Sequence, residues 1–137
     1  MSRLLINFKM SSIVIVDSIS CLNESNNGDV VVCGSHGGIS AAEYVVNRFR
    51  LNGIIVNDAG KGKGSAGIAG LQVYERIGIP AAAVDTFTAM IGNGLDNYEC
   101  GIISAVNKPA EDCGVKIGMS AKDATLIMFN KRTAKYD

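Results

Sequence analysis

The sequence lacks most of the features that mark specialised protein classes. Its 137 residues include two prolines, one histidine and no tryptophan, and its 13 basic side chains are balanced by 13 acidic ones. A chain with no net charge and no basic cluster lacks the electrostatic footprint of a nucleic-acid-binding protein. We therefore expect no nucleic-acid partner.

Long hydrophobic runs and cysteine pair motifs are also missing. The apolar runs are far shorter than the roughly 18 residues of a membrane span, and the N-terminus carries no cleavable export signal. The four cysteines, Cys21, Cys33, Cys100 and Cys113, form no C-x-x-C pair. We expect reduced thiols, no membrane segment and a cytoplasmic protein.

Hydrophobic residues, in contrast, make up 47% of the chain, which is enough for a buried core. They gather in short, continuous runs at residues 13–16, 30–33, 54–56, 81–84 and 102–106. Such runs are typical of strands that helices cover on both faces of a parallel sheet. The sequence therefore predicts about five strands.

Helical patterns separate these runs. Apolar residues recur at helical spacing over residues 39–51 and 68–77, and a glycine follows each segment closely. Ser120 begins a capping pattern for a helix through residue 131, and residues 108–113 fit a shorter helix. This alternation predicts a three-layer α/β sandwich with a mainly parallel sheet, Rossmann-like or flavodoxin-like. Residues 10–137 would form the single domain, with residues 1–9 as an extension or an edge strand.

In such sheets, ligands bind beyond the carboxyl ends of the strands. The second run is followed there by Gly34, Ser35, His36, Gly37 and Gly38. His36 would sit at a helix N-terminus, which favours anions, and imidazole transfers protons near neutral pH. The alternative is a histidine that caps the helix or bonds a neighbouring loop.

The third run leads into a second polar, glycine-rich segment, residues 57–67. Its amides, together with Lys61 or Lys63, are suited to holding a phosphate or carboxylate, unless the segment is simply a mobile surface loop. Gly62, Gly64 and Gly67 also match G-x-G-x-x-G. Residues 57–61 separate that motif from the strand, however, and the chain leaves no room for a second domain, so we expect no dinucleotide and no other cofactor.

Two further strand ends carry polar residues. Asp85 follows the fourth run, where it would orient His36 or bind a substrate hydroxyl, or else cap a helix. Asn107 follows the fifth run. Cys33 lies inside an apolar run and is interpreted as a buried small hydrophobe. The single histidine has no metal-ligand spacing around it, so no metal site is predicted.

The candidate site residues fall into two groups. The predicted catalytic residues are His36, Asp58 and Asp85. The residues predicted to bind substrate or an anion are Ser35, Gly37, Gly38, Asn57, Gly60, Lys61, Gly62, Lys63, Thr86, Thr88 and Asn107.

The run VVVCGSHGG resembles the phosphorylated-histidine segment of mannose-type phosphotransferase IIA domains, which are small α/β proteins. The segments Val84-Asp85-Thr86 and Val106-Asn107 are similar to parts of the same domains. The resemblance implies a phosphohistidine carrier in which His36 accepts a phosphoryl group from a partner protein.

The leading hypothesis is an enzyme that acts on a small carboxylate- or amide-bearing metabolite by hydrolysis, elimination or isomerisation. His36 would be the general acid or base, Asp58 or Asp85 would orient it or carry a second proton, and the amides of the glycine loops, at Gly37, Gly38, Gly60 and Gly62, would stabilise negative charge. The alternatives are the phosphohistidine carrier and a non-catalytic protein that binds a small ligand.

A homo-oligomer is also expected, because a small α/β domain cannot by itself enclose much of a ligand. The apolar residues expected near the subunit interface are Tyr44, Tyr74, Phe87, Met90 and Ile91.

Overall fold

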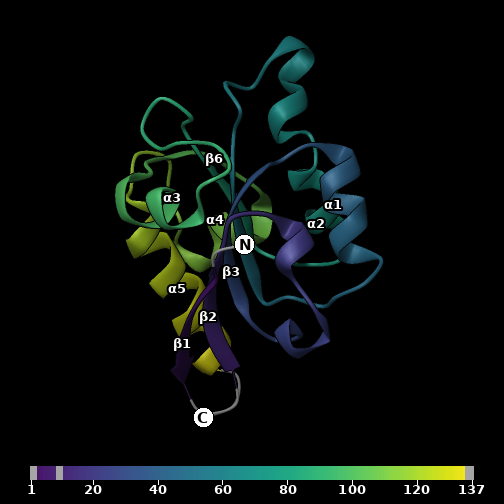
Figure 1. Cartoon of the computed structure of the whole chain (residues 1–137), viewed down its shortest axis with the longest axis vertical. Coiled ribbons are helices and arrows are strands. Elements are labelled where there is room, and N and C mark those ends of the chain that lie inside the picture. Colours follow the sequence, from purple (N-terminus) through teal and green to yellow (C-terminus); the bar gives the residue numbers. More distant parts are fainter. Residues whose placement is uncertain (1–2, 9–10, 135–137) are drawn as a thin grey trace.

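The centre of the fold is a six-stranded sheet, seen in a computed structural model that describes residues 3–8 and 11–134 (Figure 1). The strands are β1 (Arg3–Phe8), β2 (Ser11–Val16), β3 (Val30–His36), β4 (Gly53–Asn57), β5 (Ala81–Val84) and β6 (Ile103–Val106). The predicted α/β fold with a mainly parallel sheet is confirmed.

The strand order follows the sequence from β1 to β6 without a reversal. Strands β2 to β5 are parallel, whereas β1 and β6 run antiparallel at the two edges. Ligands in doubly wound sheets bind where the strand order reverses. The parallel part of this sheet contains no such point, so a ligand site here depends on the loops alone.

Helices cover both faces of the sheet and make three layers (Figure 1). One face carries α1 (Ile39–Val46), α2 (Leu71–Arg76) and three short 3₁₀ turns, Ile19–Cys21, Glu24–Asn26 and Lys63–Ile68. The other face carries α3 (Gly94–Cys100), α4 (Lys108–Cys113) and α5 (Ala121–Ala134). Within the described ranges, no helix combines the length and apolar composition of a membrane span.

The two cores follow from the alternation of side chains along each strand. Val14 and Ile54 pack toward α1 and α2, and their neighbours Ile13 and Ile55 pack toward α5. All four side chains are buried. Full burial of such a side chain contributes roughly 1.5–3 kcal/mol, which explains why the stretches 13–16 and 54–56 are apolar at every position.

Two of the predicted helices are shorter than expected. Helix α1 ends at Val46 instead of residue 51, because Phe49 and Leu51 turn into the core. Helix α2 begins at Leu71, since residues 63–68 first form a 3₁₀ segment that is kinked at Gly64 and Ser65, whose φ angles are 62° and 58°. The C-terminal helix begins as predicted, with Ser120 Oγ accepting a hydrogen bond of 3.1 Å from the amide of Asp123.

Candidate functional site

Three loops emerge together at the carboxyl edge of the parallel strands. His36 at the end of β3 is the register partner of Asn57 at the end of β4. The amide of Asp58 donates to the carbonyl of Val84, the last residue of β5, at 2.8 Å. The backbone thus brings the loops that carry His36, Asp58 and Asp85 to one edge.

The side chains of these loops, however, point in different directions. His36 is exposed and lies beside Ser40 and Tyr44 of α1. Asn57 is buried on the other face, where its Nδ2 donates to Asn97 Oδ1 of α3 at 2.9 Å and to the carbonyl of Ala89 at 3.2 Å. The imidazole and this amide therefore lie on opposite faces of the sheet.

Asp58 is buried and ties three segments together. Its Oδ1 accepts hydrogen bonds from the amides of Gly60, at 2.7 Å, and Thr86, at 3.0 Å. Its Oδ2 accepts one from Ser104 Oγ of β6 at 2.7 Å. These donors compensate the carboxylate for the water it loses on burial. Asp58 consequently fixes the loop after β4 against β5 and β6.

Asp85 organises the next turn. Its Oδ1 accepts from the amide of Phe87 at 2.8 Å, and its carbonyl accepts from Thr88 Oγ1 at 2.6 Å. Thr88 Oγ1 in turn accepts from the amide of Ile102 at 3.1 Å. Across the described part of the chain, no hydrogen bond joins His36 to Asp58 or Asp85.

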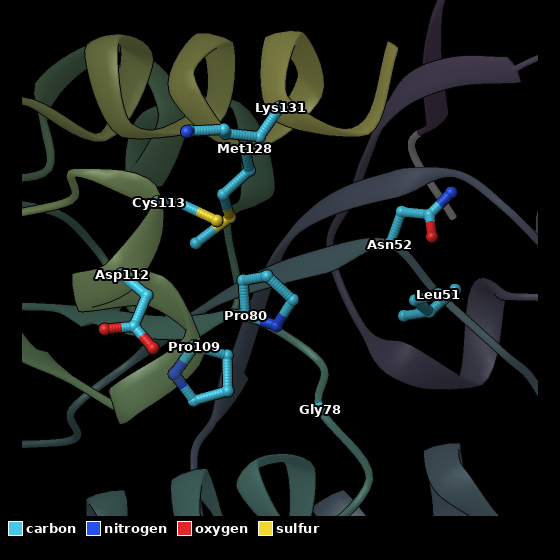
Figure 2. A pocket seen from close by; sticks show the side chains of 9 residues that line it. All are labelled: Leu51, Asn52, Gly78, Pro80, Pro109, Asp112, Cys113, Met128 and Lys131. Atoms are coloured by element: carbon cyan, nitrogen blue, oxygen red, sulfur yellow. The ribbon is translucent and has the colours of Figure 1, made fainter. Parts of the chain in front are cut away.

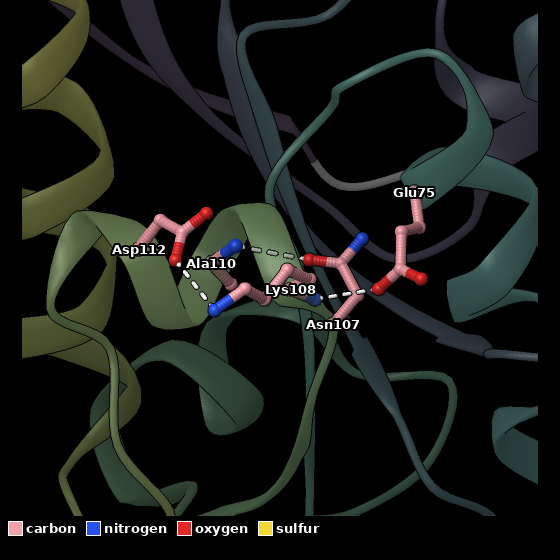
Figure 3. Close-up of polar contacts among 5 residues, drawn as sticks. All are labelled: Glu75, Asn107, Lys108, Ala110 and Asp112. Carbon is pink, nitrogen blue, oxygen red and sulfur yellow. Dashed lines mark hydrogen bonds and ion pairs between the residues drawn. The ribbon is translucent and has the colours of Figure 1, made fainter.

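Asn107 lies at the amino edge of the sheet, where the parallel strands begin. The expectation that it lies beside His36 at the carboxyl edge is wrong. Because β6 runs antiparallel to β5, the end of β6 lies beside the start of β5. Asn107 Oδ1 accepts from the amides of Ala81 and Ala110, both at 3.0 Å. Its Nδ2 donates to the carbonyls of Leu71 and Ile79. Figure 3 shows Asn107 at the start of α4, next to Lys108.

The glycine amides expected to stabilise negative charge already have partners in the protein. Gly37 donates to the carbonyls of Asn57 and Gly67, and Gly38 donates to His36 Nδ1. Gly60 donates to Asp58 Oδ1, and Gly62 donates to the carbonyl of Gly60 at 2.8 Å. These glycines allow the loops to pack backbone against backbone, because a Cβ on Gly37 would stand only 2.8 Å from the carbonyl oxygen of Gly67.

The loop after β4 has an unusual backbone. Ala59, Lys61 and Ser65 adopt positive φ angles of 53°, 66° and 58°. Such angles cost an L-residue roughly 1–2 kcal/mol. The loop is held by hydrogen bonds from the amide of Lys61 to the carbonyl of Asp58, at 2.6 Å, and from Gly67 to Lys61, at 2.8 Å. The side chain of Lys61 is half-buried and that of Lys63 is exposed.

A shallow depression of about 430 Å³ lies beside the imidazole of His36. It is rich in hydroxyl groups and is lined by Ser18, Ile19, Ser20, Ser35, His36, Ser40, Ala41 and Tyr44. Ser35 Oγ accepts a hydrogen bond from the amide of Ile19 at 3.0 Å. Helix α1 begins at this depression with Gly38 as its N-cap, so no side chain caps the helix there.

The hydrogen bond from the Gly38 amide determines the state of the His36 ring. The distance from Gly38 N to His36 Nδ1 is 3.0 Å. Because an amide N–H only donates, Nδ1 accepts, and the proton of the neutral ring lies on Nε2. The imidazole therefore offers its Nε2–H to a ligand as a hydrogen-bond donor.

A second depression, of about 360 Å³, lies at the amino edge of the sheet, where β4 and β5 begin (Figure 2). Figure 2 shows Pro80 and Pro109 near its middle, with Asp112 and Lys131 on separate helices. None of the predicted site residues lines it. Across the described ranges, no three His, Cys, Asp or Glu side chains are grouped as metal ligands.

Cys33 is buried, and this burial raises the pKa of its thiol to about 12. A thiol with so high a pKa is not a nucleophile at neutral pH. Its interpretation as a small core residue fits this environment.

Sequence reasoning did not assign to the site the four hydroxyl-bearing residues Ser18, Ser20, Ser40 and Tyr44 of the His36 depression, nor its apolar residues Ile19 and Ala41. Ser18 and Ser20 directly follow the carboxyl end of β2, so the strand-end rule that located His36 applied to them as well. No family, curated protein or solved structure matches this chain. The geometry of the depression is therefore the basis of a functional argument.

Proposed function

We propose that this protein is an enzyme that binds a small carboxylate- or amide-bearing metabolite in the His36 depression. In this proposal, the Nε2–H of His36 donates a hydrogen bond to a carbonyl oxygen of the metabolite. A neutral imidazole can polarise a carbonyl in this way, and a donor aimed at developing negative charge lowers the barrier of the reaction. The bond between Gly38 N and His36 Nδ1 is the observation that carries the proposal.

The surroundings of the imidazole support a polar, anionic ligand. The hydroxyls of Ser35, Ser40 and Tyr44 line the depression and can donate to or accept from its polar groups. The uncapped start of α1 favours a carboxylate by roughly 0.3–1 kcal/mol. Hydrolysis through a tetrahedral intermediate, and elimination or isomerisation through an enolate, each place negative charge on a carbonyl oxygen.

Asp58 and Asp85 have structural roles in this proposal. Their oxygens accept hydrogen bonds from Gly60, Thr86, Ser104 and Phe87, and neither carboxylate bonds His36. They hold the neighbouring loops at the carboxyl edge, while His36 contributes its imidazole to the depression.

The phosphohistidine carrier is less well supported by the same geometry. A ring nitrogen that attacks phosphorus needs a free lone pair. The lone pair of Nδ1 is engaged by the Gly38 amide, and Nε2 carries the proton. Phosphorylation at either nitrogen would require the ring to give up this hydrogen bond, and phosphorylation at Nε2 would also require the proton to move to Nδ1.

The experiment is a screen of short keto acids, dicarboxylates and their amides against the protein, with binding and turnover both followed by proton NMR. His36→Ala and His36→Gln should abolish turnover and weaken binding by up to about tenfold, which corresponds to the loss of one neutral hydrogen bond. Lys131→Ala, in the depression at the other edge, is the matched control and should change neither.

Three outcomes contradict the proposal. Turnover or binding that survives in His36→Ala removes the imidazole from the site. Binding that depends on His36, with no turnover of any compound, favours the non-catalytic ligand-binding protein. Alkali-stable label from phosphoenolpyruvate and phosphotransfer proteins, lost in His36→Ala, favours the carrier.

A further inference from the structure

The segment between β5 and α3, continuing into α3, exposes four large apolar side chains. The exposed fractions are 91% for Phe87, 66% for Met90, 47% for Ile91 and 44% for Leu95. We refer to these four residues as the apolar strip. Single exposed apolar residues are ordinary, but four within nine positions of one segment mark an interaction surface. Two other residues from the expected interface lie elsewhere, since Tyr74 is buried in the core and Tyr44 lines the His36 depression.

Hydrogen bonds hold the backbone of the strip in place. The amide of Phe87 donates to Asp85 Oδ1 at 2.8 Å, and the amide of Met90 donates to Asp96 Oδ2 at 2.7 Å. The carbonyl of Met90 accepts from Asn97 Nδ2 at 2.8 Å. Phe87 and Met90 therefore cannot turn into the core without breaking this network, and the strip is a preformed surface.

Charges of opposite sign flank the strip. Lys61 and Lys63 lie in the loop after β4, which contacts the start of this segment through the hydrogen bond from Thr86 N to Asp58 Oδ1 at 3.0 Å. Asp96 and Glu99 lie in α3, which follows the strip. In the described part of the chain, neither lysine pairs with a carboxylate. The loop that borders the start of the strip thus carries two lysines, and the helix that follows its end carries two carboxylates.

We propose that this surface binds a second copy of the same chain around a two-fold axis through the apolar strip. A two-fold axis brings the same patch of both copies together in opposite directions. The lysines of one copy then face the α3 carboxylates of the other, twice per dimer. This surface fits a partner that has an apolar centre and the same two charges in reverse order. A second copy of the chain has these features.

The size of the strip agrees with this occupant. Its four side chains expose on the order of 400 Å² of apolar area, with Phe87 supplying the largest share. A standard interface buries roughly 800 Å² on each partner, and about half of it is apolar. The strip would supply the apolar centre of the interface, and the flanking lysines and carboxylates would supply the polar rim.

The test is the mass of the protein in solution from about 1 to about 100 μM, measured by sedimentation equilibrium. Wild type should approach twice 14.4 kDa. Phe87→Asp should raise the dissociation constant at least about tenfold, since a buried aromatic centre is the usual hot spot. Ile117→Asp, at an isoleucine that is 66% exposed outside the strip, is the matched control and should leave the mass unchanged. Equal thermal unfolding of the two variants verifies that both fold.

Charge reversal tests the orientation of the two copies. Lys61→Glu with Lys63→Glu makes both ends of the surface acidic, and Glu99→Lys reduces the charge difference between them. Each variant alone should dimerise less than wild type, whereas an equimolar mixture should form a mixed dimer, because at one of its two contacts the lysines of the Glu99→Lys chain face the α3 carboxylates of the other chain. A wild-type monomer at every concentration, a dimer that persists in Phe87→Asp, or variants that do not associate when mixed would each overturn the proposal.

Discussion

The carboxyl and amino edges of this sheet use the same residue types for different purposes. Asn107 at the amino edge and Asp58 at the carboxyl edge are both buried, and each joins three segments through its side chain. The carboxyl edge differs in what it adds around this structural residue. An exposed imidazole with an available Nε2–H, three non-glycine residues with positive φ, and the apolar strip all occur there.

This difference separates structural polar residues from candidate functional ones. A polar side chain at a strand end gives no indication of function when all of its hydrogen-bonding atoms have partners inside the protein, since burial alone requires those partners. His36 is informative because Nδ1 accepts the only hydrogen bond found for the ring among the described residues, while the residue lines a depression.

The amino edge should suffer the largest loss of stability when its structural residue is removed. Asn107→Ala leaves the amides of Ala81 and Ala110 and the carbonyls of Leu71 and Ile79 without their partner. We expect the free energy of unfolding in urea to fall by about 3–5 kcal/mol. Lys108→Ala is the control, because it removes only the exposed ion pair with Asp112 at 3.1 Å, seen in Figure 3, and should leave the free energy of unfolding nearly unchanged.

The corresponding change at the carboxyl edge should have a smaller effect. Asp58→Ala removes the acceptor of three hydrogen bonds, and two of those donors are amides of partly exposed loop residues. We expect a loss of about 2–4 kcal/mol in urea unfolding. Asp85→Ala, which removes one exposed bond to Phe87, should cost about 1 kcal/mol or less. Equal losses of unfolding free energy in Asp58→Ala and Asp85→Ala would show that Asp58 contributes no more to stability than Asp85 does.

These contrasts also explain which features the sequence could predict. The strand at residues 81–84 and the helix that begins after Ser120 depend on local apolar patterns and a local cap, so they were predicted well. Helix α3 was missed because Gly92 and Gly94 favoured a loop. Its N-cap was nevertheless visible as Asn93, whose Oδ1 accepts from the amide of Asp96 at 2.9 Å.

The positions of the candidate site residues depend on strand direction and register, which no local sequence pattern contains. The apolar run at residues 102–106 predicts a strand but does not give its direction, and the antiparallel direction of β6 moved Asn107 to the other edge. The register between β3 and β4 shifts between Val32 and His36. Such an irregularity changes which face a side chain occupies, so the separation of His36 from Asn57 could not be predicted from strand ends alone.

The buried core between the two edges should make the protein less stable at alkaline pH. Burial raises the pKa of Cys33 from 9.0 to about 12 and raises the pKa of Tyr74 as well. Above pH 9, the unfolded chain therefore loses protons that the folded chain keeps, and the free energy of unfolding falls as the pH rises. Urea titrations between pH 8 and 11 should show this fall, with a shallower slope in Cys33→Ala. A flat profile in wild type would contradict it.

The strained loop at the carboxyl edge offers a small gain in stability. Lys61 has a φ of 66°, so Lys61→Gly should relieve strain and raise the free energy of unfolding by about 0.5–1 kcal/mol. Lys63 is the matched control, because it is not among the residues with positive φ, and Lys63→Gly should be neutral or destabilising. Both are best compared in the Phe87→Asp background, so that dimerisation does not enter the measurement.

The smallest change in stability should come from His36, although it is central to the proposed function. His36 is exposed and makes one hydrogen bond, from the Gly38 amide, so His36→Ala should alter the free energy of unfolding by less than about 1 kcal/mol. Because the chain has a single histidine, the ring gives one set of signals in long-range ¹H–¹⁵N NMR spectra. For the neutral ring, these signals should show a protonated Nε2 and an unprotonated Nδ1. A ring protonated at Nδ1 would break the contrast between the edges, because His36 would then lack the donor that distinguishes it from Asn107.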